Sequence, residues 1–121
     1  MQSRDNRTFI AGEDLSAAQF KFVTLEADGQ VDLADAAGEN AIGVCLAGAA
    51  AGAAVTVCVS GSVMVEAGGA ITAGDQIQTG ADGTALLAAT GDVVLGYARE
   101  DGVDGQIIEI EMIQGGNVVP A

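Results

Sequence analysis

The chain has 121 residues, enough for one domain and too few for a second independent core. Apolar residues make up 50% of it but aromatic residues only 3%, so Val, Ile, Leu and Ala must build the core; the 18 glycines favour tightly turned β-structure. The 17 acidic and 4 basic residues give a formal net charge of −13. Because such a surface repels phosphate, we expect no nucleic-acid partner and no membrane.

The first eleven residues have the composition of an extended arm. They contain no apolar run long enough for a secretion signal. They do contain two of the four basic residues and a short apolar pair, namely Arg4, Arg7, Phe9 and Ile10. Beyond the arm, the segment 14–20 predicts a short helical turn, because Asp14 or Ser16 can cap it.

From Phe20 onward the pattern is that of short strands separated by turns. Apolar residues alternate at spacing two, and pairs such as Asp28-Gly29 and Asp82-Gly83 form tight turns. Strands are expected at residues 20–25, 31–33, 41–46, 55–60, 63–66, 85–87, 93–97 and 106–113, with a break at Gly61. The sequence therefore predicts an all-β, single-domain β-barrel or sandwich-like fold with one short helical turn. Its parts are an N-terminal arm (1–11), a β-domain (12–114) and a flexible tail (115–121).

Residues 41–65 carry no charge and imitate a membrane span. The flanking residues are Glu39 and Glu66 rather than Lys or Arg, and the second half of the segment alternates as a strand does. We interpret the segment as buried strands joined by a Gly/Ala connector.

The sequence offers little for catalysis. It contains no histidine, which removes the commonest general base, the serine triad and most zinc sites. It also lacks the glycine motifs of hydrolases and nucleotide-binding proteins. Cys45 and Cys58 lie in apolar runs, where burial raises the pKa of a thiol and makes it inert. We expect a protein that is not an enzyme and binds no cofactor.

Acidic turns raise the question of calcium. Asp101 and Asp104 are the best candidates, because calcium prefers carboxylates and backbone carbonyls. The pair lacks the spacing of an EF-hand loop, and Asp-Gly is also the commonest tight-turn dipeptide. Turn formation explains these residues better than metal binding.

One face of the segment 55–66 is small and weakly polar. If Val55, Val57 and Val59 fill the core, the alternate residues form the opposite, outward face. In a monomer such a face usually carries charged residues. This face consists of Thr56, Cys58, Ser60 and Met64. Subunit contact explains it well, although small Gly, Ala and Thr surfaces are also tolerated in solvent.

A series of glycine- and valine-rich stretches runs from residue 12 to residue 113. It comprises Gly12-Glu-Asp-Leu-Ser-Ala-Ala-Gln-Phe-Lys-Phe-Val23, Asp28-Gly-Gln-Val31, Ala41-Ile-Gly-Val-Cys-Leu46, Ala51-Gly-Ala-Ala-Val-Thr-Val57, Ser60-Gly61, Ala73-Gly-Asp75, Asp82-Gly83, Gly96, Gly105 and Ile108-Glu-Ile110. In this order the series resembles the tailed-bacteriophage capsid decoration proteins, also called cement or head-stabilising proteins.

The resemblance implies a structural virion protein with a β-barrel-like fold. Such a protein is made in the cytoplasm of the host bacterium and binds the major capsid protein on the outer capsid surface, at capsomer junctions. It often does so as a homotrimer, has no catalytic residues, and stabilises the mature head. Because decoration proteins commonly engage the shell with terminal arms, Arg4, Arg7, Phe9 and Ile10 become candidate capsid-binding residues. An ordinary disordered terminus is the alternative.

A second hypothesis is a calcium-dependent β-module, either an adhesin or a carbohydrate-binding domain. Its stability would fall sharply on chelation, because the acidic loops would repel one another without metal. The scarcity of aromatic residues argues against a sugar-stacking site. An enzyme would have to work with carboxylates alone.

Overall fold

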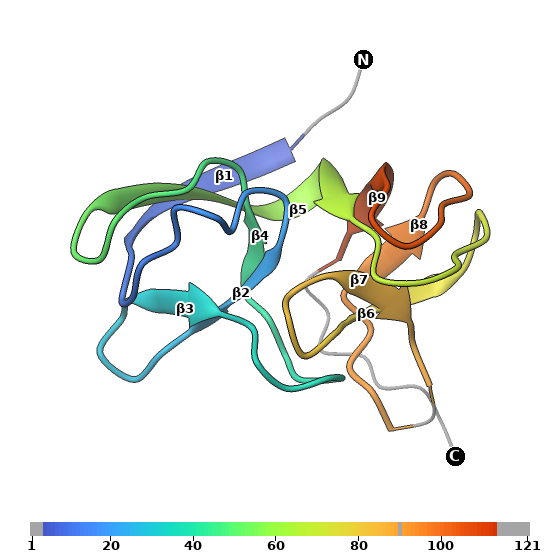
Figure 1. Cartoon of the computed structure of the whole chain (residues 1–121), viewed down its shortest axis with the longest axis horizontal. Coiled ribbons are helices and arrows are strands. Elements are labelled where there is room, and N and C mark those ends of the chain that lie inside the picture. Colours follow the sequence, from blue (N-terminus) through green and yellow to red (C-terminus); the bar gives the residue numbers. More distant parts are fainter. Residues whose placement is uncertain (1–3, 90, 114–121) are drawn as a thin grey trace.

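The computed structural model describes residues 4–89 and 91–113, and all regular elements among them are β-strands (Figure 1). The strands are β1 (Arg4–Ile10), β2 (Phe22–Leu25), β3 (Val31–Leu33), β4 (Gly43–Cys45), β5 (Ala54–Glu66), β6 (Gln76–Thr79), β7 (Ala85–Leu87), β8 (Gly96–Ala98) and β9 (Ile107–Met112). The all-β prediction is therefore confirmed. The predicted tail, 115–121, lies outside the described residues.

The strands form one curled sheet that resembles half a barrel (Figure 1). Their order is β3-β2-β4-β5-β9-β8-β6-β7, and β1 pairs with β5 outside this path. All strand pairs are antiparallel. The segment 41–65 contributes β4 and β5, and no helix in the described part of the chain is long and apolar enough to cross a membrane.

The N-terminal segment is extended, as expected, and it is a strand of the sheet. Strand β1 pairs with residues 54–61 of β5, with an irregularity in register between Asp5 and Asn6. Phe9 packs against a buried cluster, which ties the segment to the domain. The arm is thus held by its pairing with β5 and by one partly buried ring.

The predicted helical turn at 14–20 is wrong. Two successive four-residue turns replace it: the Ala18 N–H donates to the Leu15 carbonyl (3.0 Å) and the Lys21 N–H donates to the Ala18 carbonyl (3.1 Å). Asp14 does accept a hydrogen bond from the Ser16 N–H, at 3.0 Å. The segment is too short for a helix to sustain itself, so the local turn prevails.

The predicted break at Gly61 is also wrong, because β5 runs through it without interruption. Gly61 adopts a φ of 94°, in the left-handed region that glycine enters without steric cost. The residue bends the strand and keeps its pairing on both sides.

The sheet consists of two units of the same design, which are called here the first and the second unit. The first unit contains β1 to β4 and residues 54–60 of β5; the second contains residues 61–66 of β5 and β6 to β9. Cross-strand partners correspond at a separation of about 54 residues. Matching pairs are Val23–Leu33 with Ile77–Leu87, Val23–Gly43 with Ile77–Gly96, and Phe9–Val55 with Val65–Ile108.

The connections repeat as well. Glycines with positive φ occur at equivalent turns, namely Gly29 and Gly83 (82° and 81°), Gly38 and Gly91 (79° and 87°), and Gly52 and Gly105 (85° and 86°). The parallel bridge from Ala11 to Val31 in the first unit recurs as Ala67 to Ala85 in the second. Loops of the two units therefore follow the same backbone path.

Two buried clusters fill the fold. One is the interior of the first unit and includes Val23, Val31, Val55 and Val57. The other combines the interior of the second unit with the outer row of the first unit, formed by the cross-strand neighbours Phe22, Val44 and Cys58. The second unit thus covers one face of the first.

The equivalent row of the second unit is polar. It consists of Gln76, Tyr97 and Glu111, which are cross-strand neighbours in the same register. Tyr97 is 37% exposed, whereas Val44, its counterpart, is 0% exposed. Tyr97 and Glu111 are exposed and Gln76 is partly exposed, so this row resembles the polar cap of a repeat protein.

The duplication predicts that Gly43 and Gly96 play the same structural role. A Cβ at Gly43 would lie 2.1 Å from the Cys58 carbonyl oxygen, and one at Gly96 would lie 2.2 Å from that of Glu111. Gly43→Ala and Gly96→Ala should each lower the free energy of unfolding by about 1–3 kcal/mol, through forced separation of β-strands. Urea denaturation measures the change.

Gly69→Ala is the matched control, because its added Cβ would meet only a Leu86 methyl at 3.5 Å. It should change the free energy of unfolding by no more than about 0.5 kcal/mol. Equal losses for the control and for the two strand variants would contradict the proposed close approach of the strands.

Candidate functional site

The four residues predicted for the arm do not form one surface. Phe9 is partly buried against the core of the first unit, whereas Ile10 is 41% exposed. Arg7 is exposed and forms an ion pair with Asp5 at 2.7 Å, a surface pair that contributes little to stability. Arg4 is placed by its backbone pairing with Gly61. Among the predicted residues whose side chains the structure describes, Arg7 and Ile10 are therefore exposed to a partner.

The weakly polar face predicted on β5 is interrupted. Thr56 is exposed, and Ser60 and Met64 are partly exposed. Cys58 is 0% exposed, because the second unit covers this part of the strand. Cys58 must therefore be removed from the predicted subunit-contact residues. The sequence argument assumed one buried face, whereas at Cys58 β5 is buried on both faces.

Both cysteines are thiols within the sheet. The Cys45 Sγ lies 3.3 Å from the Ala47 carbonyl and the Cys58 Sγ lies 3.2 Å from the Ser60 carbonyl. Burial raises the pKa of the Cys45 thiol, and the hydrogen bond to Ala47 opposes this shift in part. The neutral thiol is the form that this site favours.

The loop with Asp101 and Asp104 serves the fold. An Asp101 carboxylate oxygen accepts a hydrogen bond from the Ala73 N–H at 2.8 Å and so ties two loops of the second unit together. Asp104 is exposed. Among residues 4–89 and 91–113, no three carboxylates or cysteines are arranged to hold a metal ion.

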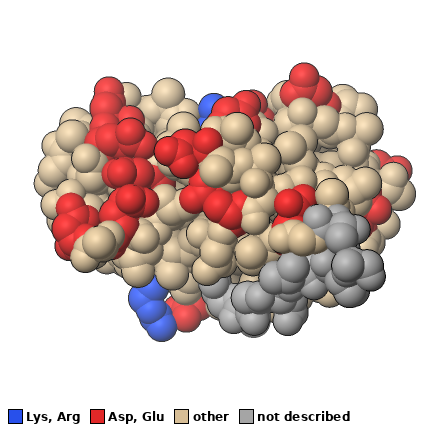
Figure 2. Space-filling view, turned by 90° about the horizontal axis from the view of Figure 1, so that it is seen from below, with Lys and Arg blue, Asp and Glu red and all other residues tan. Residues whose placement is uncertain are grey.

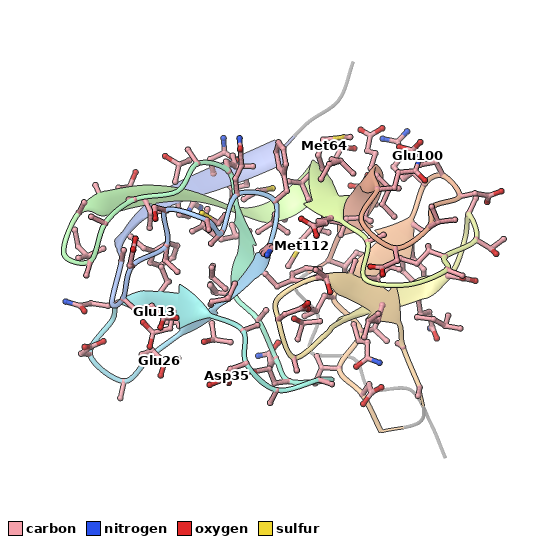
Figure 3. The ribbon with its side chains drawn as sticks, viewed as in Figure 1. Glu13, Glu26, Asp35, Met64, Glu100 and Met112 are labelled. Atoms are coloured by element: carbon pink, nitrogen blue, oxygen red, sulfur yellow. The ribbon has the colours of Figure 1, made fainter. Side chains whose placement is uncertain are left out.

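An acidic pocket in the first unit is the concave feature that the sequence did not predict. It has a volume of about 370 Å³ and is lined by Glu13, Thr24, Glu26, Asp32, Leu33, Ala34, Asp35, Glu39 and Ala81. Glu13, Glu26 and Asp35 lie on the same side of the sheet, away from Met64 (Figure 3). Acidic side chains also gather on the face seen in Figure 2. Strands β2 and β3 and four loops, those after β1, β2, β3 and β6, bring these residues together.

Three of the pocket's carboxylates are engaged by hydrogen bonds. Glu13 accepts one from the Leu33 N–H (2.8 Å), Glu26 from the Thr24 hydroxyl (2.7 Å), and Glu39 from the Ala36 N–H (2.6 Å). These contacts hold the loops of the first unit. The pocket is therefore partly a consequence of loop anchoring by acidic side chains.

Asp32 is a member of this group whose charged form is unfavourable. Its Oδ1 atom is buried without a hydrogen-bond partner. Loss of hydration raises the pKa of Asp32, and repulsion from Glu13, Glu26, Asp28 and Asp35 raises it further. The first unit thus tolerates an unfavourable charge at this position.

Three matching positions of the second unit are not acidic. The positions of Glu13, Glu26 and Asp32 correspond to Gly69, Gly80 and Leu86. The Leu86 side chain lies over both glycines: a Cβ there would meet it at 3.5 Å and 3.1 Å, respectively. An apolar contact in one unit is therefore replaced by carboxylates in the other.

A different irregularity lies where the first unit meets β5. Phe20 adopts a φ of 65°, the one positive value for a non-glycine residue in the described part of the chain. Such a conformation costs on the order of 1–3 kcal/mol. Its N–H donates to the Cys45 carbonyl at 2.7 Å, and its carbonyl accepts from the Glu66 N–H at 2.8 Å. Both units therefore determine the backbone at this residue.

Comparison with known proteins identifies the family of this chain. The family model described as "phage cement protein" matches residues 1–111. The chain belongs to the phage cement protein family. It is accordingly a structural protein of a phage capsid, associates with that capsid, and is a component of the virion. The match includes β1, so the strand belongs to the family's shared region.

The same fold occurs in a solved structure of a phage protein. The crystal structure of the N base of head fiber gp8.5 of bacteriophage phi29 superposes with a TM-score of 0.72 at 22% sequence identity. The match covers 95% of this chain and 98% of that one. This similarity establishes the fold of the cement protein. No curated protein matches the sequence.

The raised pKa of Asp32 predicts a pH dependence of stability. Because the folded state holds the proton more tightly than the unfolded chain, this residue's contribution to stability falls as the pH rises through the range between the two pKa values. At pH 7 the charged form opposes folding. Asp32→Asn should therefore raise the urea midpoint at pH 7, and the gain should disappear toward pH 3, where wild-type Asp32 is itself protonated.

Asp104→Asn is the control, because it removes the same charge from an exposed loop. A gain of the same size in the control would assign the effect to the net charge of −13 rather than to the pocket. A lower midpoint for Asp32→Asn at pH 7 would contradict the raised pKa.

Proposed function

We propose that this cement protein binds the outer surface of a phage head at junctions between capsomers, contacts the major capsid protein there, and stabilises the mature head. The match of the family model to residues 1–111 carries the proposal. The protein acts without catalysis: its sequence has no histidine and both of its thiols are buried. The proposed function depends on the free energy of binding alone.

The charge of the protein supports an outer location. A net charge of −13 opposes contact with packaged DNA, which is itself negatively charged. On the outside the same charge keeps decorated heads apart in solution. Figure 2 shows acidic side chains gathered on parts of one face of the molecule.

The arm supplies one proposed contact with the shell. Arg7 and Ile10 are exposed on β1, and Arg4 precedes them at the start of the strand. Phe9 is assigned to the core of the first unit instead, since it packs there. Basic and apolar side chains on an otherwise acidic protein are complementary to a negatively charged surface of the partner protein.

Self-association is the second part of the proposal. Thr56, Ser60 and Met64 lie on β5 with exposed or partly exposed side chains, and they form the proposed contact of a homotrimer on the capsid. A trimer multiplies the contacts that each site makes with the lattice. Even a modest interface per subunit then gives strong retention, because linked binding events reinforce one another.

Co-sedimentation with heads of the source phage tests the function. The purified protein should bind expanded heads saturably, at a fixed ratio to the major capsid protein, and should prefer them to unexpanded proheads. Bound heads should resist heating better than bare heads. Failure to bind either form would contradict the proposed function.

The arm is tested in the same assay with Ile10→Ser. The side chain is exposed, so the variant should fold normally and bind heads about tenfold more weakly. Val103→Ser is the control, because Val103 is 63% exposed in a loop of the second unit. Equal binding by wild type and Ile10→Ser would remove the arm from the contact.

A further inference from the structure

Phe20 has a backbone conformation that favours glycine, and a glycine occupies the equivalent position of the second unit. It is the third residue of the turn closed by the hydrogen bond from the Lys21 N–H to the Ala18 carbonyl. The equivalent turn of the second unit is closed from the Asp75 N–H to the Thr72 carbonyl, and its third residue is Gly74 with a φ of 92°. Turns with a positive φ at this position strongly favour glycine.

The surrounding contacts show that the backbone is imposed by the fold. The Phe20 N–H donates to the Cys45 carbonyl at 2.7 Å, and the Gly74 N–H donates to the Ala98 carbonyl at 2.8 Å. Cys45 and Ala98 are themselves equivalent residues of β4 and β8. A glycine would fit the first unit as it fits the second. Phe20 therefore stands at a position where glycine would avoid the unfavourable backbone conformation.

The ring of Phe20 lies outside both buried clusters. The two other phenylalanines, Phe9 and Phe22, pack in or against the buried clusters. Phe20 is partly exposed and is a member of neither cluster. A strained aromatic residue outside the core points to a role in recognition.

We propose that Phe20 is an anchor residue for the capsid shell, and that its ring enters an apolar pocket on the major capsid protein. Rigid aromatic side chains are the commonest centres of binding energy in protein interfaces. The adjoining Gln19 amide donates to the Leu46 carbonyl at 3.1 Å, so the segment is held in place before binding. This inference rests on the proposed function.

Two variants separate recognition from folding, because glycine and asparagine both tolerate positive φ. Phe20→Gly and Phe20→Asn should melt at or above the temperature of the wild type and should bind expanded heads at least tenfold more weakly. Leu87→Ala is the control, since Leu87 is 53% exposed on the second unit. It should bind as the wild type does.

The outcomes are distinct. If wild-type protein binds heads and both variants bind equally well, Phe20 is not an anchor. If both variants melt well below the wild type, the ring serves folding and the inference is overturned. If wild-type protein does not bind heads at all, the proposed function fails before Phe20 is tested. A tenfold loss in Leu87→Ala would show that exposed apolar area, rather than Phe20, controls binding.

Discussion

Strand β5 is the constraint on which the rest of the structure depends, because both units need it to complete their sheets. Its first half pairs with β1 and β4, and its second half pairs with β9. Val57 points into the core of the first unit, and the neighbouring Cys58 belongs to the core shared with the second. A bend at Gly61, with a φ of 94°, lets one strand serve two units that face different directions. A chain almost without aromatic residues thereby fills two adjacent buried clusters from one strand.

The two units have the same backbone but different surfaces. The row of Phe22, Val44 and Cys58 is buried by the second unit, whereas its counterpart ends in polar side chains. Around that counterpart, the Arg99 guanidinium donates to the Ser62 hydroxyl at 2.7 Å, and that hydroxyl donates to Glu111 at 3.0 Å. This network places polar and charged groups beside the row, which is unfavourable for apolar packing against it.

The departures from the common design gather in the first unit. They are the acidic pocket around Asp32 and the strained Phe20, where the second unit has Leu86 and Gly74, together with the exposed residues of β1. Each of them costs stability or solubility in the isolated protein. Such costs are understandable where a surface is shaped for a partner. We therefore propose that the first unit makes the contact with the capsid.

Local patterns in the sequence predicted the class of fold and most of the strands. Alternation in 55–60 and 106–113 and the Asp-Gly turns at 28–29 and 82–83 were sufficient for this. The signal of the duplication was present in the same turns, since Gly38 and Gly91 and also Gly52 and Gly105 recur at matching spacing. The burial of Cys58 and the acidic pocket could not be predicted in this way. Both depend on which unit covers which face, and that is a property of long-range packing.

The most direct test is an electron cryomicroscopy reconstruction of expanded heads saturated with the protein, at a resolution that shows side chains. The account predicts density on the outer surface, with β1 and Phe20 of the first unit against the shell and the row of Gln76, Tyr97 and Glu111 in solvent. A subunit bound through that polar row, with the first unit facing away from the shell, would contradict it.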